Sequence, residues 1–481
     1  MKRLTCLLLP LLVAGAALGA PANADLSTSP LFQKAVTEYK SGQLDLAVTD
    51  LKAFIAQTPD YEPAHGLLGY LYLKQDMPTD AIGELKSAVK LSPDDWSAHN
   101  NLGAAYRKAG QMGEAIAQYQ ILISHDPKNA AANRNMGLAL GLEDKYDEAV
   151  DYFHKAIAEQ PDAETYKNLA YALEKVKQFP EAADTYRKAA SVDPNDSAAW
   201  LNAGLLYEAL GDRIKAIGCL DKAIDLNTPF QFEAHYALGE AYGATNHVDW
   251  AIKEFTAAAQ LDPTDYASVY NLGAMQARAG QDRDAIASYQ KALTLKPGDL
   301  RVITGLAELL AANGKPDEAK QMLETAHERN PSVPEPIAAL GDIASQTGDV
   351  GTAITEYRAA LRLSPKDDDV RLELAQVYNS QKDYSEAAAQ FDMIAQDRPG
   401  DASIENQRGL AYEQAGDLRE ASSAFQAAIA ADGKNAEAQN NLGVVYEKQG
   451  KIKPAVDAYR KAVEIDPNLT EAKENLARLD R

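Results

Sequence analysis

A pattern of apolar and polar residues repeats along most of the chain. The segment NNLGAAYRKAG at residues 100–110 returns as NNLGVVYEKQG at residues 440–450, and YNLGAMQARAG stands between them at residues 270–280. The outer two segments are 340 residues apart, which is ten periods of 34 residues. Prolines keep nearly the same step, at Pro59, Pro93, Pro127, Pro161, Pro194, Pro229, Pro263, Pro297, Pro331, Pro365, Pro399 and Pro467. A fixed period of this length indicates an array of structural repeats.

Each period contains small and bulky residues whose spacing predicts two closely packed helices. Glycine costs about 1 kcal/mol relative to alanine inside a helix, so its recurrence implies that a neighbouring helix lies very near. The recurring glycines are Gly69, Gly103, Gly137, Gly204, Gly239, Gly273, Gly341, Gly409 and Gly443. Alanine stands at one position in all thirteen periods: Ala47, Ala81, Ala115, Ala149, Ala182, Ala216, Ala251, Ala285, Ala319, Ala353, Ala387, Ala421 and Ala455. A bulky residue follows four residues later on the same helix face and fills the space beside the small residues, as at Tyr119, Phe153, Tyr186, Phe255, Tyr289, Phe391, Phe425 and Tyr459.

A turn between the two helices is predicted five residues before each alanine. A helix end favours a residue in the left-handed conformation, and glycine adopts it without steric cost. The glycines at this position are Gly42, Gly110, Gly211, Gly280, Gly314, Gly348, Gly416 and Gly450. Asp76, Asp144 and Asn246 tolerate the same conformation, whereas Lys177 and Lys382 do so less well. The proline then ends the second helix because it cannot continue the hydrogen-bond ladder.

These positions resemble the tetratricopeptide repeat (TPR) family. The resemblance rests on the Leu-Gly pair, the invariant alanine, the aromatic residue four positions later, the final proline, and a tyrosine three residues after the glycine at Tyr72, Tyr106, Tyr207, Tyr242, Tyr412 and Tyr446. It implies an all-α, right-handed superhelical solenoid of thirteen units. The units are about 28–61, 62–95, 96–129, 130–163, 164–196, 197–231, 232–265, 266–299, 300–333, 334–367, 368–401, 402–435 and 436–469. Residues 470–481 are expected to form a cap helix with Ala472, Leu476 and Leu479 on its inner face.

Residues 1–24 have the layout of a cleaved secretory signal peptide. Two basic residues precede an apolar run at residues 4–18, and small residues follow up to Ala24. Cleavage before Asp25 predicts a periplasmic or secreted protein, and family members with such a leader are mostly bacterial. An uncleaved membrane anchor is the alternative, although the run is short for a membrane span and no second apolar run follows.

Cysteine usage agrees with export but adds little. Cys6 is removed with the leader, which leaves Cys219 as the only cysteine and excludes a disulfide bond within the chain. We interpret Cys219 as a small buried residue in a helix. The alternative is a disulfide bond between two chains.

The charge of the chain narrows the class of partner. The 481 residues carry a formal net charge of −22, which disfavours nucleic acid and anionic membrane surfaces as partners. The resemblance places certain positions of the first helices in a concave groove, where Glu208 and Glu240 stand. Lys and Arg residues do not line successive groove positions, so no basic site for acidic C-terminal tails is predicted. The sequence therefore predicts a protein or peptide partner that is neutral or basic, and it leaves the oligomeric state open.

Asparagine recurs at the sixth position of the unit. Because asparagine is a poor helix former, its recurrence inside a helix suggests a specific role. The residues are Asn101, Asn135, Asn168, Asn202, Asn271 and Asn441. The resemblance implies that this position faces the groove, where a ladder of asparagines binds the backbone of a peptide. A carboxamide both donates and accepts hydrogen bonds, as a peptide unit does. The alternative is that these asparagines bond neighbouring helices to one another.

No catalytic or cofactor site is predicted. His65, His99 and His235 occupy one repeat position, which indicates packing, and no further ligands are spaced for a metal ion. We therefore expect a non-enzymatic scaffold or adaptor without metal or cofactor, which binds extended polypeptides and serves a bacterial envelope assembly. A structural spacer or self-assembling array is one alternative. A regulatory or substrate-presenting subunit of an envelope enzyme is another.

Overall fold

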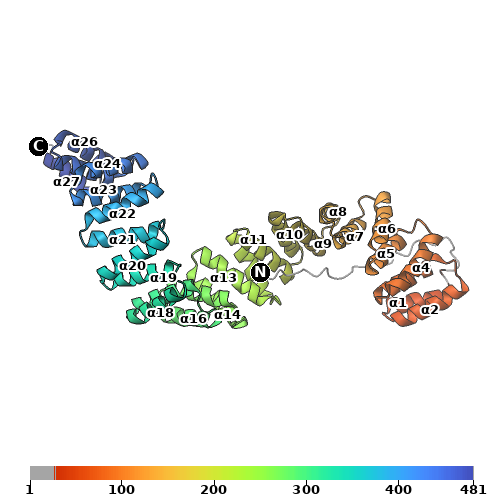
Figure 1. Cartoon of the computed structure of the whole chain (residues 1–481). Coiled ribbons are helices and arrows are strands. Elements are labelled where there is room, and N and C mark those ends of the chain that lie inside the picture. The colour runs from red at the N-terminus through yellow and green to blue at the C-terminus, as the bar shows by residue number, and fades with distance from the viewer. Residues whose placement is uncertain (1–26, 28, 480–481) are drawn as a thin grey trace. The chain divides into compact units, whose positions relative to one another are not determined.

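The computed structural model describes residue 27 and residues 29–479, and it contains 27 α-helices and no strand within them. Residues 1–24, which carry the predicted signal peptide, lie outside the described residues. The helices form thirteen consecutive pairs and a last single helix, which confirms the predicted all-α repeat array with a cap helix (Figure 1). The first helices of the pairs are α1 (Pro30–Lys40), α3 (Glu62–Lys74), α5 (Trp96–Lys108), α7 (Ala130–Leu142), α9 (Ala163–Lys175), α11 (Ser197–Ala209), α13 (Gln231–Ala244), α15 (Tyr266–Arg278), α17 (Leu300–Ala312), α19 (Glu335–Gln346), α21 (Asp368–Ser380), α23 (Ala402–Ala415) and α25 (Ala436–Lys448).

The second helices complete each pair. They are α2 (Leu44–Gln57), α4 (Pro78–Leu91), α6 (Met112–His125), α8 (Tyr146–Glu159), α10 (Phe179–Val192), α12 (Arg213–Asp225), α14 (Val248–Leu261), α16 (Asp282–Leu295), α18 (Pro316–Arg329), α20 (Val350–Leu363), α22 (Tyr384–Asp397), α24 (Leu418–Ala431) and α26 (Ile452–Ile465). The cap helix is α27 (Thr470–Leu479). The array divides into two compact units, one containing α1 to α14 and the other α15 to α27.

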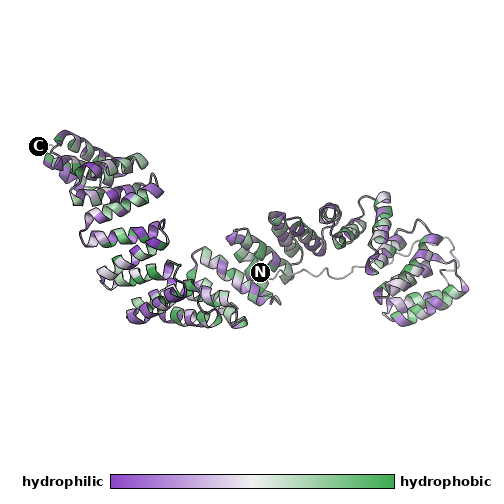
Figure 2. Cartoon of the chain, in the orientation of Figure 1, coloured by the Kyte–Doolittle hydropathy of each residue, from purple (hydrophilic) through white to green (hydrophobic). Residues whose placement is uncertain are grey.

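The core follows the small and bulky positions. All thirteen recurring alanines are fully buried. A methyl group added at Gly103 would lie 2.5 Å from the ring of Tyr119, and one added at Gly409 would lie 2.6 Å from the ring of Phe425. The glycine is therefore required because the aromatic residue of the second helix packs directly against the backbone of the first. Hydrophobic and hydrophilic residues intermix along every helix, as expected when only part of each helix faces this core (Figure 2).

The turns adopt the predicted left-handed conformation in all thirteen repeats. Gly416 has φ +87°, and even Lys177 and Lys382 have φ +65°. The lysines are held there because the geometry of the turn is common to every repeat. Cys219 is buried with 3% of its surface exposed, and burial raises the pKa of its thiol to about 11.

The cap helix α27 packs through Ala472, which is fully buried, whereas Leu476 and Leu479 are half-buried. Polar contacts add to this packing. Asn475 donates to the side chain of Asn440 in α25 over 3.1 Å, and Arg478 pairs with Glu447. The Arg478 guanidinium lowers the pKa of that carboxyl.

Side chains at the fourth position join one repeat to the preceding one. Five of them donate to the carbonyl of the proline that ends the previous second helix. The donors are His65 to Pro59 over 2.8 Å, His99 to Pro93 over 3.0 Å, Asn133 to Pro127 over 3.0 Å, Trp200 to Pro194 over 3.1 Å, and Arg371 to Pro365. His65 and His99 thus lie in the packing between repeats, and His235 bonds Glu254 of α14 over 2.6 Å.

His65 has acceptors on both ring nitrogens. Nε2 faces the Pro59 carbonyl, and Nδ1 lies 2.6 Å from a carboxylate oxygen of Glu84 in α4. The hydrogen bond with Glu84 raises the pKa of His65, since both bonds are made only by the doubly protonated ring. In the first turn of α3, burial and a hydrogen bond with Asp95, the N-cap of α5, raise the pKa of Glu62 to about 8.

Raising the pH from about 6 to about 9 is expected to loosen α3 and α4. Both folded-state pKa values are raised, so the folded chain binds these two protons more tightly than the unfolded chain does. The contribution of His65 is complete below its unfolded pKa of about 6.5 and is lost as the pH rises through its higher folded value. Deprotonation of Glu62 lowers the stability further, up to about pH 8. Hydrogen exchange of α3 and α4, corrected for its intrinsic pH dependence, measures the effect.

The next repeat supplies the control. His99 Nδ1 lies 2.8 Å from the side-chain oxygen of Gln118, so its acceptor there is neutral rather than charged. Glu84→Gln copies this arrangement and should lower the pKa of His65 and flatten the rise in exchange. If Glu84→Gln left the pH dependence of α3 and α4 unchanged, the His65–Glu84 pair would not be its source.

Candidate functional site

The first helices line the inner side of each compact unit. They contact the first helix of the next repeat, as α3 does α5, α5 does α7, α7 does α9, α11 does α13, α15 does α17, α17 does α19, α19 does α21 and α23 does α25. No two successive second helices come equally close in the part of the chain that the structure describes. Because the array is more tightly spaced on the side of the first helices, that side is its inner face, and the candidate site lies there.

Four of the six predicted asparagines lie on successive first helices of one unit, with Asn101 on α5, Asn135 on α7, Asn168 on α9 and Asn202 on α11. Asn271 and Asn441 lie in the other unit, on α15 and α25. Asn101 is 2% exposed and Asn135 is 6% exposed, so their side chains face mainly protein. The other four are half-buried. A peptide-binding role for these residues stays a prediction.

Two of these asparagines bond a neighbouring helix. Asn135 donates to the carbonyl oxygen of the Asn100 side chain over 2.8 Å, and Asn441 donates to Asn406 over 3.2 Å. The acceptors occupy the fifth position of the preceding repeat, which the sequence analysis did not consider. The paired asparagines at residues 100–101 and 440–441 were the sign in the sequence that the fifth position can also carry a side chain able to bond a neighbouring helix. At Asn135 and Asn441 the structure contains the helix-to-helix bond that was the alternative interpretation.

Basic residues on the inner face of the first unit are neutralised. Arg134 of α7 lies 3.5 Å from Asp162, and Lys167 of α9 lies 2.7 Å from Asp196. Both aspartates are N-caps of the next first helix. Arg134 and Lys167 stand at the same position of neighbouring repeats. Their charges are nevertheless compensated within the chain.

A row of carboxyl groups crosses the inner face of the second unit. Glu308, Asp342 and Glu373 lie on the successive helices α17, α19 and α21. Within the described residues none of the three pairs with a Lys or Arg side chain, and Asp342 accepts only from the hydroxyl of Tyr357 over 2.7 Å. We call these three residues the acidic row. From the sequence, only Glu208 and Glu240 of the first unit were predicted as acids of the groove, although Glu240, Glu308 and Asp342 share the ninth repeat position.

Desolvation is the largest cause of the raised pKa values of these carboxyl groups, and neighbouring acids contribute to the shift at Glu308 and Glu373. Desolvation by the surrounding helices raises the pKa of Glu308 and of Glu373, and the charge of Asp342 raises both further. The pKa of Asp342 is also raised by desolvation, although its bond from Tyr357 opposes the shift. In the first unit, burial and the charge of Glu208 raise the pKa of Glu240. A nearby cation would favour the charged form of each group.

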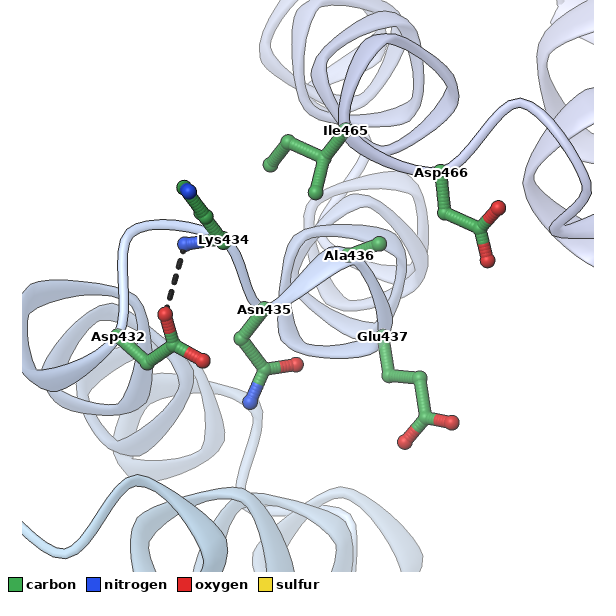
Figure 3. A pocket seen from close by; sticks show the side chains of 7 residues that line it. All are labelled: Asp432, Lys434, Asn435, Ala436, Glu437, Ile465 and Asp466. Atoms are coloured by element: carbon green, nitrogen blue, oxygen red, sulfur yellow. Dashed lines mark hydrogen bonds between the residues drawn. The ribbon is translucent and has the colours of Figure 1, made fainter.

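Surface depressions outside the inner face show no site of comparable promise. An open depression near the start of α25 is lined by Asp432, Lys434, Asn435, Ala436, Glu437, Ile465 and Asp466. Its carboxyl groups do not converge on one point, and Asp432 accepts from the backbone of Lys434 (Figure 3). Among the described residues, no three His, Cys, Asp or Glu side chains are grouped to hold a metal ion. Nor is any described helix long and apolar enough to cross a membrane.

Comparison with known proteins gives partial relatives. A human protein, Superkiller complex protein 3, is 35% identical over 83 residues, which are 17% of this chain and 5% of that protein. The C-terminal part of a TPR repeat-containing protein from Cytophaga hutchinsonii aligns over 50% of this chain and 99% of its own, with 18% identity and a TM-score of 0.44. A chain of the Naa15/Naa10 complex bound to HypK-THB aligns over 94% of this chain and 95% of its own, with 13% identity and a TM-score of 0.35.

The family models cover most of the chain. One model described as tetratricopeptide repeat matches residues 32–95, 67–123, 100–164, 167–217, 210–265, 236–299, 338–402 and 406–469. A second model of the same description matches residues 276–343. These matches agree with the thirteen helix pairs and with the glycine, alanine and aromatic positions that pack them. The chain therefore belongs to the tetratricopeptide repeat family.

Proposed function

We propose that this chain is a non-enzymatic scaffold that binds an extended, neutral or basic polypeptide segment along the inner face of its first helices. A TPR array is consistent with a protein–protein interaction scaffold, and scaffolds of this kind are generally non-catalytic. The observation that carries the charge preference is the acidic row. Three carboxyl groups on successive helices have no Lys or Arg partner among the described residues, so a basic polypeptide would supply the missing cations.

The spacing of the row suits an extended chain. Packed helices lie about 8–10 Å apart, and an extended polypeptide advances about 3.3 Å per residue. Each helix of the row would therefore meet roughly every third residue of a bound segment. In the first unit, Asn168 and Asn202 are half-buried and bond no asparagine of a neighbouring helix within the described residues, so we propose them before Asn101 and Asn135 as contacts to a peptide backbone.

The proposed setting is a bacterial envelope, outside the cytoplasm. The layout of residues 1–24 supports it, because a positive start, an apolar run and small residues before Asp25 are typical of an exported precursor. Native protein that retained Met1 in a cytosolic fraction would overturn this part of the proposal.

A displayed library of random twelve-residue peptides, selected on the full chain, tests the binding role. We expect enrichment of Lys and Arg at about every third position. Selected peptides should bind about tenfold more weakly to the triple variant Glu308→Gln, Asp342→Asn and Glu373→Gln, because three favourable contacts of roughly 0.5 kcal/mol each are lost. Fluorescence anisotropy of labelled peptides measures the affinity.

The control removes the same charge from a second helix. Asp317, Glu324 and Glu328 are exposed on α18 outside the inner face, and Asp317→Asn, Glu324→Gln and Glu328→Gln should leave binding unchanged. Equal weakening by both triple variants would indicate a general charge effect rather than a site. A library that yields no binders would favour the structural spacer.

A further inference from the structure

A small niche lies on the first unit where α7, α8 and α9 meet. Its enclosed part has room for about one methyl-sized or water-sized group. The lining is aliphatic and aromatic apart from the carboxamide of Asn168 and two tyrosine hydroxyls, and consists of Gly137, Leu138, Gly141, Tyr146, Phe153, Asn168, Tyr171 and Ala172. In this niche a cavity and one of the predicted asparagines, Asn168, coincide.

The two glycines of the niche are related differently to the packing around them. A methyl group at Gly137 would lie 2.8 Å from the ring of Phe153, so Gly137 is required by packing. A methyl group at Gly141 would meet nothing within 4 Å. Gly141 is the last but one residue of α7, and packing gives no reason for a glycine there. In the last repeat the equivalent position is occupied by Glu447, which accepts from the hydroxyl of Tyr459 over 2.9 Å.

The carboxamide nitrogen of the niche lacks a partner. The side-chain nitrogen of Asn168 is buried and makes no hydrogen bond in the described residues. Of the two tyrosine hydroxyls in the lining, that of Tyr146 donates to Asp144 over 2.8 Å. A buried donor without an acceptor is unfavourable, so the niche is suited to a group that brings a carbonyl oxygen.

The walls of the niche are aromatic and rigid. The rings of Tyr146 and Tyr171 meet edge to face with centroids 6.2 Å apart. The ammonium of Lys175 lies 5.0 Å from the centre of the Tyr171 ring and 5.8 Å from that of Tyr146. These contacts hold both rings in place beside Gly141, which favours a small aliphatic group over a large one.

We infer that this niche binds the methyl side chain of an alanine in an extended polypeptide, with a main-chain carbonyl of that segment accepting from Asn168. The methyl group fills the space beside Gly141, and the carbonyl satisfies the free amide nitrogen. The inference rests on the proposed function and deepens it, because it assigns a residue preference to one point of the inner face. The competing occupant is a single ordered water molecule, which would satisfy Asn168 but show no preference for a methyl group.

The full-length chain with labelled asparagine side chains, observed by NMR, tests the inference with two probes. N-acetylalanine methylamide carries the methyl group, and N-acetylglycine methylamide lacks it. We expect the alanine probe to shift the side-chain amide resonances of Asn168 saturably, with an affinity about fourfold above that of the glycine probe. The side-chain resonances of Asn441, whose amide already bonds Asn406, should not move.

Two variants define the site. Gly141→Ala places a methyl group in the niche itself and should abolish the preference for the alanine probe while leaving the helix intact, because alanine is the better helix former. Gly113→Ala is the matched control, since a methyl group there on α6 also meets nothing within 4 Å. It should leave the alanine probe bound as in the wild-type chain.

Failure of this inference can be separated from failure of the proposed function. Equal responses of Asn168 to both probes, or none, would show that the niche holds only water and would overturn the inference. Peptides selected through the acidic row would still bind the Gly141→Ala variant in that case. If Gly113→Ala abolished the response as well, the effect would not belong to the niche, and the inference would also fall.

Discussion

Replacing Phe425 with alanine is expected to lower the free energy of unfolding of its repeat by about 3–5 kcal/mol. The ring is fully buried, and its edge lies against the backbone of Gly409. Because Gly409 has no side chain, nothing from α23 can move into the space that the ring leaves. The cavity therefore persists and adds its cost to the lost burial of the ring. Urea unfolding combined with hydrogen exchange measures the change.

The loss should stay near the substitution. Each repeat contacts mainly its neighbours, so exchange is expected to rise in α23 to α26 far more than in α15 to α18. Ile214→Ala is the control for loss of an apolar side chain, since Ile214 is 83% exposed, and it should change stability by less than about 0.5 kcal/mol. A uniform rise in exchange along the chain would contradict a linear array of repeats.

Replacing Ala285 with leucine is expected to cost about 1–3 kcal/mol for the opposite reason. Ala285 is fully buried on α16 and belongs to the alanine position that is occupied in every repeat. Extra methylene groups at this point would push α15 and α16 apart. Hydrogen exchange should rise mainly at residues 266–299, and unfolding in urea should begin there at a lower concentration.

An exposed alanine on the same helix separates overpacking from a general effect of leucine. Ala287 is exposed two residues further along α16, so Ala287→Leu adds the same side chain without crowding the joint. It should leave exchange close to that of the wild-type chain. Equal loosening by both variants would mean that the alanine position does not set the distance between the helices.

The sequence by itself determined the paired helices, the turn conformation and the matching of small to bulky residues. Each of these depends on residues within one repeat. Gly103 contacts Tyr119, which lies sixteen residues later in the chain. The turn residue precedes the recurring alanine by five residues. Contacts this local recur in every period, so the pattern of thirteen periods shows them repeatedly. Even Lys177 and Lys382 were placed in the left-handed turn by their position alone.

Only the tertiary structure decided what the inner face offers a partner. Whether an asparagine there is free depends on the residue about 35 positions earlier, as Asn135 depends on Asn100. Such pairs differ from repeat to repeat, so the period does not reveal them. The acidic row required three helices of different repeats to be brought side by side. The niche required knowing that Gly141 of α7 and Asn168 of α9 line the same hollow, and that a methyl group added at Gly141 would meet nothing within 4 Å. Packing within a repeat is therefore encoded locally, whereas the chemistry of its surface arises from contacts between repeats.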